Sequence, residues 1–407
     1  MSETCPEPAS GLESRAGPIG GPTDGERPLP LTGITVVELG HSVAAPYAGQ
    51  ILADLGAKVV KVENPSHGDD ARLWGPPFWH GSSATFQSLN RNKLSVAVNL
   101  KDEPQLAQLR DYIVSSADVV IQNLRPGLVE RFGLDESLTE LSPRLVYCNL
   151  GAFGSSGPLS HKPGYDPMMQ AFGGIMSVTG EMGRAPVRVG PSIIDMGAGM
   201  WCVIGILSAL FRRAGGGPGG RVETSLYETA LAWMTVPTAM TLAGQEPERT
   251  GSEAAMLAPY KAYQAGDGKF VVVAAGNDNL FRRLCAVLGR EEWVADPRFA
   301  TNAERLCHRE VLNGLIEDLL QADTSAGWVS RLEAAGVPCS PLQSTSEVIA
   351  HPQTAALGML QPTPDARMSL MSLPLRFDGR RPPIRSGPPE LGADTEAVVR
   401  AKEDAGR

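Results

Sequence analysis

The order of apolar and polar positions past the first 30 residues opens with a β-α-β unit. Ile34–Leu39 is a short β-branched run, and residues 45–55 have helical apolar spacing that ends at Gly56. Val59–Val62 follows as a second strand. Three further strands are expected at 95–100, 119–121 and 145–148. Strands that alternate with helices predict a doubly wound, Rossmann-like parallel sheet, so the fold class is α/β.

One helix between the expected strands is predicted by its apolar spacing. Leu106, Leu109 and Ile113 form an apolar face between the third and fourth strands, and Asp102 stands where an N-cap is expected. A longer apolar run, Met196–Phe211, predicts a buried core helix. It is shorter than the roughly 20 residues that cross a bilayer.

A glycine-rich run at 214–220 follows that helix and predicts a domain boundary there or slightly later. Beyond it, Asp267 and Gly268 separate two apolar runs at 260–264 and 269–274, which predicts a hairpin, and amphipathic helices are expected near 280–288 and 311–320. The expected organisation is a disordered tail at 1–30, a large α/β domain at 31–224, a smaller α+β domain at 225–335 and a C-terminal segment at 336–407. The last segment contains a proline-rich stretch at 382–389, which predicts that it returns to the large domain or wraps a partner.

Composition excludes several classes of protein. A net charge of -9 over 407 residues leaves no basic face for nucleic acid. The six cysteines have neither disulfide-framework nor zinc-site spacing, and they are expected to be buried thiols. The start of the chain does not have the apolar segment of a signal peptide, so we expect a cytoplasmic protein that binds no membrane.

The motifs for common cofactors and nucleophiles are missing from the sequence. Glu63 ends the second strand where a ribose-binding acid of a dehydrogenase would stand, but the turn at 40–46 does not contain G-x-G-x-x-G. There is no P-loop, no G-x-S-x-G serine motif and no histidine pair with metal-ligand spacing, so no metal site is expected. Two carboxylates remain. Asp195 opens the long apolar helix as either an N-cap or a nucleophile, and Asp166 follows Gly164 and Tyr165 as either an Asx turn or a site residue.

A series of motifs in a fixed order then identifies a resemblance. The chain resembles the class III CoA-transferases, which include formyl-CoA, carnitine and succinate-linked dicarboxylate CoA-transferases and, as relatives, the α-methylacyl-CoA racemases. The resemblance runs from about Leu31 to Val399 and is carried by the segments 45–57, 60–63, 68–72, 89–95, 122–127, 164–166, 194–195 and 388–392.

The resemblance implies that Asp195 is the catalytic carboxylate, which attacks the thioester of an acyl-CoA and forms a mixed anhydride. It also implies that the large domain binds CoA as a substrate, that no cofactor is permanently bound, and that two chains form an interlocked homodimer. The positions that match CoA or substrate contacts in the family are Val43, Ala44, Asn64, Arg72, Lys101, Asn123, Leu124, Arg125, Arg131, Tyr165 and Asp166. The loop 276–278 matches a loop that closes over the acyl group, without the glycine run of formyl-CoA transferases.

Two alternatives stay open beside a transferase. A racemase would need a histidine for proton exchange at the α-carbon, and the matching stretch, 134–141, contains none. An inactive relative would bind CoA without transferring it. Segments 74–77, 90–93 and 186–188 are most similar to the succinate-linked dicarboxylate transferases, so succinyl-CoA is the expected donor and a free carboxylic acid the acceptor.

Overall fold

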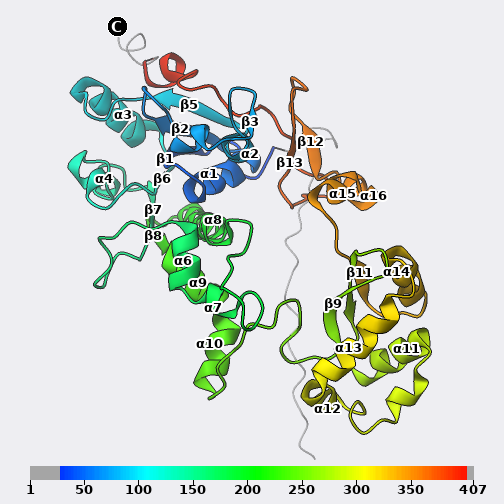
Figure 1. Ribbon diagram of the computed structural model, residues 1–407. Coiled ribbons are helices and arrows are strands. Elements are labelled where there is room, and N and C mark those ends of the chain that lie inside the picture. The colour runs from blue at the N-terminus through cyan, green and yellow to red at the C-terminus, as the bar shows by residue number, and fades with distance from the viewer. Residues whose placement is uncertain (1–27, 401–407) are drawn as a thin grey trace, which may run out of the picture.

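The computed structural model describes residues 28–400, which form a large lobe, a smaller lobe and a C-terminal segment that returns to the large lobe (Figure 1). Most of the tail expected to be disordered (1–30) and the last seven residues lie outside the described part. The large lobe is built on a parallel six-stranded sheet with the order β5-β2-β1-β6-β7-β8. Its strands are β1 (Thr35–Leu39), β2 (Lys58–Glu63), β5 (Lys93–Ala97), β6 (Val119–Gln122), β7 (Val146–Gly151) and β8 (Gly220–Ser225).

This order confirms the predicted α/β sheet and locates its crevice. The chain adds strands outward from β1 in one direction as far as β5 and then crosses to β6 on the other side. The direction therefore reverses between β1 and β6. In open α/β sheets, ligands bind at such a reversal, outside the carboxyl ends of the strands.

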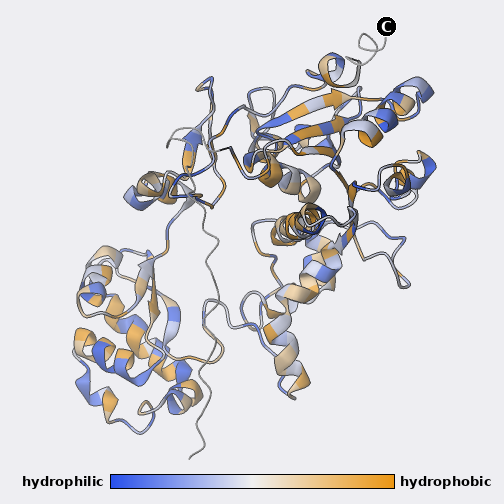
Figure 2. Cartoon of the chain, turned by 180° about the vertical axis from the view of Figure 1, so that it is seen from behind, coloured by the Kyte–Doolittle hydropathy of each residue, from blue (hydrophilic) through white to orange (hydrophobic). Residues whose placement is uncertain are grey.

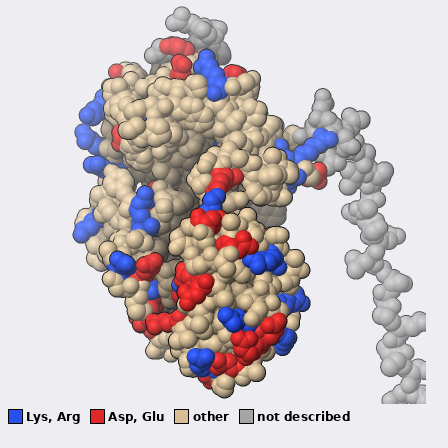
Figure 3. All heavy atoms as spheres, turned by 45° about the vertical axis from the view of Figure 1, so that its right-hand side comes forward, with Lys and Arg blue, Asp and Glu red and all other residues tan. Residues whose placement is uncertain are grey.

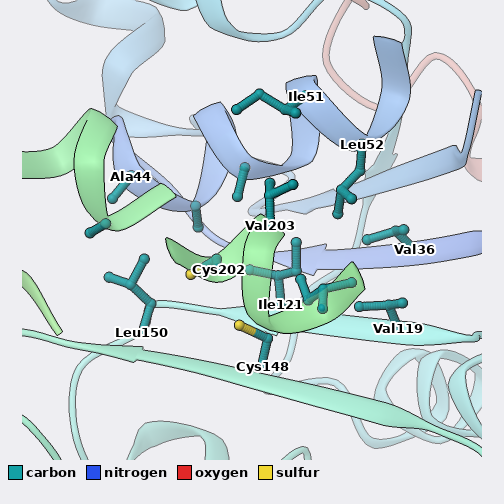
Figure 4. Close-up of a cluster of buried hydrophobic side chains, with 14 of the residues drawn as sticks. Val36, Ala44, Ile51, Leu52, Val119, Ile121, Cys148, Leu150, Cys202 and Val203 are labelled. Carbon is teal, nitrogen blue, oxygen red and sulfur yellow. The ribbon is translucent and has the colours of Figure 1, made fainter. Parts of the chain in front are cut away.

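Helices cover both faces of the sheet. On one face, α1 (Ala44–Asp54) and α8 (Ile193–Ala214) share a core with side chains from four strands, as Figure 4 shows for Val36, Ile121 and Cys148. On the other face, α3 (Glu103–Ser116) packs its buried Leu109 and Ile113 against the sheet. The predicted N-cap is confirmed, because the Asp102 side chain accepts a hydrogen bond from the Gln105 amide.

The glycine-rich run after α8 is a tight return to the sheet. A Cβ atom on Gly219 would lie 2.1 Å from the Leu145 carbonyl oxygen, so only glycine fits there. Strand β8 starts at the next residue, and α9 (Leu226–Trp233) then adds Leu226 and Ala230 to the core of the large lobe. No helix or strand crosses this run, because α8 ends at Ala214 and β8 starts at Gly220.

The smaller lobe has its own core around an antiparallel sheet of β9 (Tyr260–Gln264), β10 (Phe270–Ala274) and β11 (Cys339–Pro341). The predicted hairpin about Asp267 and the two predicted helices are confirmed. The helices of this lobe are α11 (Asp278–Leu288), α12 (Asn302–Cys307), α13 (Arg309–Leu320) and α14 (Ser325–Ala334). Figure 3 shows acidic and basic side chains intermixed over its surface.

The C-terminal segment passes through α15 (Thr345–Ala350), α16 (Pro352–Leu357) and the hairpin of β12 (Leu360–Pro362) and β13 (Ser369–Met371) before it reaches the large lobe. There the Ser95 amide donates to Asp394 Oδ2 at 2.9 Å and the Ala97 amide donates to Thr395 Oγ1 at 3.0 Å. The segment thus covers the free edge of β5.

Shorter elements complete the described chain. They are η1 (Asp70–Leu73), β3 (Phe78–Trp79), β4 (Ser82–Ser83), α2 (Ala84–Leu89), α4 (Leu128–Arg131), α5 (Leu138–Leu141), α6 (Asp166–Phe172), α7 (Ile175–Val178), α10 (Thr235–Leu242), η2 (Glu291–Val294) and η3 (Glu396–Arg400).

The structure tests two expectations from composition, a buried apolar helix and buried thiols. By length and composition α8 could cross a membrane, and it is apolar along most of its length (Figure 2), but it packs against α1 and the sheet as the predicted core helix. Cys148, Cys202 and Cys285 are free and buried, and Cys339 is free and half-buried. Cys307 is free and exposed, which corrects the expectation that all the thiols are buried, and Cys5 lies outside the described residues.

Candidate active site

Two adjoining cavities open where the strand order reverses. The first has a volume of about 320 Å³ and lies over the carboxyl ends of β1, β2 and β5. The second is smaller, at about 100 Å³, and lies toward β6, β7 and the start of α8. His41 and Leu124 line both cavities, so the two adjoin at the switch point.

Most of the residues expected at the site are brought together in these walls. Asn64, Lys101 and Leu124 line the first cavity. Ala44, Asn123, Leu124, Arg125, Tyr165 and Asp195 line the second. Val43 lines a third cavity, and Arg72, Arg131 and Asp166 line none of the three.

The guanidinium group of Arg72 is occupied by contacts with other residues of the protein. Its guanidinium donates from Nε to Glu63 Oε2 at 2.8 Å and from Nη2 to Glu63 Oε1 at 2.7 Å, and it stacks 3.8 Å from the centre of the Phe86 ring. By contrast, Arg131 is exposed, and its guanidinium lies 5.8 Å from the ring of Phe132 in the wall of the first cavity. Of these two expected phosphate contacts, Arg131 stands at a cavity edge and has no carboxylate partner among residues 28–400.

The turn between β1 and α1 separates the two cavities and is held from both sides. Asn123 accepts a hydrogen bond from the His41 amide at 3.0 Å and donates one to the His41 carbonyl at 3.0 Å. Asp69 Oδ1 accepts from the Ser42 amide at 3.0 Å, and Ser42 has a φ of 72°, which is costly for a residue other than glycine. Such a conformation persists only where surrounding contacts enforce it.

A buried group of charges lies beneath this turn. Lys61 Nζ contacts Glu38 Oε1 at 2.9 Å and Asp69 Oδ2 at 2.8 Å, and it donates to the Gly40 carbonyl at 2.7 Å. Lys93 contacts Glu38 Oε2 at 2.8 Å. Burial alone would favour a neutral Asp69, but its ion pair with Lys61 holds the pKa of Asp69 below its ordinary value. Burial lowers the pKa of Lys93 to about 8.

Asp195 has a different environment. It lies in the first turn of α8, with Ser192 as the N-cap, so the simple capping role does not belong to it. The cap comes from Asp166, whose Oδ2 accepts from the amides of Ile194 at 2.8 Å and Asp195 at 3.2 Å. Gln170 donates to the other oxygen of Asp166 at 2.7 Å.

Its environment makes Asp195 an unusually weak acid. Burial, and then the charge of Asp166, raise the pKa of Asp195 to about 7. The side chain of Asp195 has no hydrogen-bond or ion-pair contact among those found within residues 28–400. A carboxylate with a raised pKa in the wall of a cavity is a candidate nucleophile or base, because it is ionisable near neutral pH and is not neutralised by a cation.

Some residues of the site were not expected from the sequence. His41 lines both cavities, and burial lowers its pKa. Its position in the first βα turn was the available signal. Asp69 belongs to a segment that carried the family resemblance, but its contacts with Lys61 and Ser42 depend on the fold.

Comparison with known proteins identifies the family of the chain. Residues 31–395 match CoA-transferase family III. The chain belongs to this family. This family III transferase is 37% identical to acetyl-CoA:oxalate CoA-transferase from Acetobacter aceti, covering 92% of this chain and 96% of that protein.

Two further matches span the family III chain. It is 34% identical to succinate–glutarate CoA-transferase from Agrobacterium fabrum, covering 92% of this chain and 98% of that protein. The crystal structure of a CAIB/BAIF family protein from Brucella suis superposes with a TM-score of 0.84 at 37% identity, covering 92% of this chain and all of the other. The enzyme is therefore a class III CoA-transferase, and acyl-CoA and carboxylic acids are the substrates that fit its family.

Proposed function

We propose that the protein moves CoA from a dicarboxylic acyl-CoA, with succinyl-CoA as the expected donor, to a free carboxylic acid through covalent intermediates on Asp195. The observation that carries this proposal is the placement of Asp195, a carboxyl group with a pKa of about 7 and no ion-pair partner among the described residues, in a cavity that adjoins a larger one at the sheet's switch point.

In the first step, an ionised oxygen of Asp195 attacks the thioester carbonyl carbon. A C–O bond forms, the C–S bond breaks, and CoA leaves as a thiolate, which gives an acyl-aspartyl anhydride. The thiolate then attacks Cγ of Asp195, which forms an aspartyl-CoA thioester and releases the first acid as a carboxylate.

The second acid reverses this sequence. Its carboxylate attacks the aspartyl-CoA thioester, forms a new anhydride and expels the CoA thiolate. The thiolate attacks the acyl carbon of the new anhydride, so the product acyl-CoA forms and Asp195 returns as a carboxylate. No net proton, oxidant or reductant is needed.

The two cavities suggest how CoA lies. Lys101 at the first cavity and Arg131 at its edge are exposed cations suited to the phosphates of CoA. The thioester end would then reach the second cavity past His41, where Arg125 and Tyr165 join Asp195. The loop 276–278, with its single glycine, is not in either wall. Asn277 caps α11 and Asp278 pairs with Arg305.

We further propose that two chains assemble, as the interlocked homodimer of the family would require. Met200, Trp201, Ile204 and Phe211 form an exposed apolar stripe along α8, and α10 has no buried residue. Apolar patches of this extent normally meet a partner. A second copy is the expected partner, and the cytoplasm is the expected compartment.

The test is a CoA-exchange assay with a panel of acyl-CoA donors and free acids, read by mass spectrometry. Transfer from succinyl-CoA to an added acid supports the proposal. Deuterium uptake at the α-carbon without an acceptor would instead establish a racemase. Tight CoA binding with no transfer to any acid would establish an inactive relative.

A further inference from the structure

A third cavity, of about 330 Å³, is lined in part by α1 and by the start of α8. The same two elements also contribute residues to the cavity of Asp195. Val43 lines the third cavity and the next residue, Ala44, lines the second. Ser192 and Met196, on either side of Asp195 in the sequence, also line the third cavity. The third cavity therefore adjoins the residues on both sides of the point at which an acyl group would be attached.

One polar group in the wall lacks a partner. Gln50 is 4% exposed, and its Oε1 atom is buried with no hydrogen-bond partner among the described residues. An unsatisfied buried amide costs free energy, and such groups are rare in folded proteins unless they serve a ligand or water. Because the ends of a carboxamide exchange on rotation by 180°, Gln50 can present either a donor or an acceptor to a ligand.

The rest of the wall favours an anion. Arg91 is the cation of this wall, and it uses Nε and Nη2 to hold Asp54 at 3.1 and 2.5 Å, which leaves Nη1 outside that fork. Tyr47 adds a phenol, and burial raises its pKa, so the hydroxyl stays protonated and can donate. None of the described residues in this wall is acidic.

We propose that the third cavity binds the distal carboxylate of a dicarboxylic acyl group, with Gln50 and Tyr47 as hydrogen-bond donors and Arg91 as the cation. The inference rests on the proposed function and adds its substrate-specificity site. A dicarboxylate would bind by its distal carboxylate here while its other carboxyl carbon reacts at Asp195. A monocarboxylate of equal length would leave these polar groups without a ligand, and buried polar groups discriminate strongly against such analogues.

The test uses the purified full chain with Tyr47→Phe and Gln50→Leu, and it compares succinate with butyrate, which has the same four carbons and no distal carboxylate. Wild-type enzyme should prefer succinate. Each substitution should raise the KM for succinate about 10-fold and change the KM for butyrate less than about 2-fold, as the loss of one hydrogen bond to a charged group predicts. Arg91 is left intact because Asp54 depends on it.

A stability measurement separates a binding role from a structural one. Since Gln50→Leu replaces an unsatisfied amide with an apolar group, it should leave Tm unchanged or raise it. Tyr112→Phe is the matched control, because Tyr112 is a buried phenol on α3 outside the third cavity, and it should leave both KM values unchanged.

The outcomes distinguish the two proposals. If the wild-type enzyme transfers CoA to neither acid nor to any other in the panel, the proposed function fails. If it transfers CoA but treats succinate and butyrate alike, or if the variants weaken both acids equally, the transferase stands and the carboxylate site is overturned.

Discussion

The two halves of the sheet differ in whether their buried charged groups form ion pairs. On the side of β5, β2 and β1, buried lysines and carboxylates pair with each other under the first βα turn, as Lys61 does with Glu38 and Asp69. On the side of β6, β7 and β8, the core against α8 is apolar, and Asp195 lies near Asp166 with no ion-pair partner among residues 28–400. The pKa of Asp69 is accordingly lowered and that of Asp195 raised. Paired charges fix geometry, whereas the unpaired carboxylate keeps its reactivity.

The strongest test of this contrast is Asp195→Ala. It should lower CoA transfer by more than about 1000-fold, because loss of a covalent nucleophile removes the whole route. CoA exchange is the measurement, and retained CoA binding shows that the cavities persist. Asp111→Ala changes an exposed carboxylate on α3 and should have no effect. An active Asp195→Ala protein would refute the assignment.

Loss of a buried ion pair in the first half of the sheet should lower the stability of the protein. Lys61→Met leaves Glu38 and Asp69 buried beside each other, which should lower the free energy of unfolding by about 3–5 kcal/mol. Lys58→Met, at the exposed start of β2, should change it by less than about 0.5 kcal/mol. Urea unfolding compares the two variants. Equal, small effects would mean that the buried charges do not support the turn.

The stability of the protein should depend on pH through Asp195. Since the pKa of Asp195 is raised from its ordinary value of 3.8 to about 7, ionising it disfavours the folded state. The stability that comes from the protonated acid is complete below about pH 4 and is lost as the pH rises through 7. Asp195→Asn should therefore match the wild type near pH 4 and exceed its stability above pH 7, by at most about 4 kcal/mol.

The same pKa predicts the rate profile. kcat/KM should rise with pH to a plateau above 7, and at pH 5 it should be about 1% of the plateau, because the nucleophile must be ionised. Asp166→Asn removes the neighbouring charge and should move the profile to lower pH. A profile that is flat between pH 5 and 8 would contradict the raised pKa.

The smallest effects are expected at the exposed cations. Lys101→Ala or Arg131→Ala should raise the KM for the acyl-CoA donor by an amount worth roughly 1–3 kcal/mol and leave the KM for the free acid nearly unchanged. Steady-state kinetics with each substrate varied in turn measures the split. If both KM values rise equally, CoA does not bind along this edge of the sheet.

Periodicity and turn chemistry predicted much of the fold. The β-α-β opening, the Asp102 cap and the hairpin at Asp267 are local patterns, and all three are present. Strand β8 was missed because a glycine-rich run usually ends an element. Here Gly219 permits a close approach to Leu145 that only the folded sheet requires.

The site was predictable in its location but not in its contacts. A resemblance along the chain indicated which positions meet at the sheet edge, and most of them line the two cavities. It did not indicate that Arg72 is taken up by Glu63, or that Asp166 caps the helix that carries Asp195. Such pairings join residues from separate elements, so neither spacing nor composition specifies them.

The C-terminal segment that covers the edge of β5 is translated long after the strands of the sheet. The ribosome completes the six strands by residue 225, yet the bonds to Ser95 and Ala97 come from Asp394 and Thr395, near the end of the chain. A nascent large lobe therefore carries an open strand edge while the whole smaller lobe is translated. Open edges invite pairing with other chains, so premature termination shortly before residue 392 should produce aggregates rather than a slightly shortened enzyme.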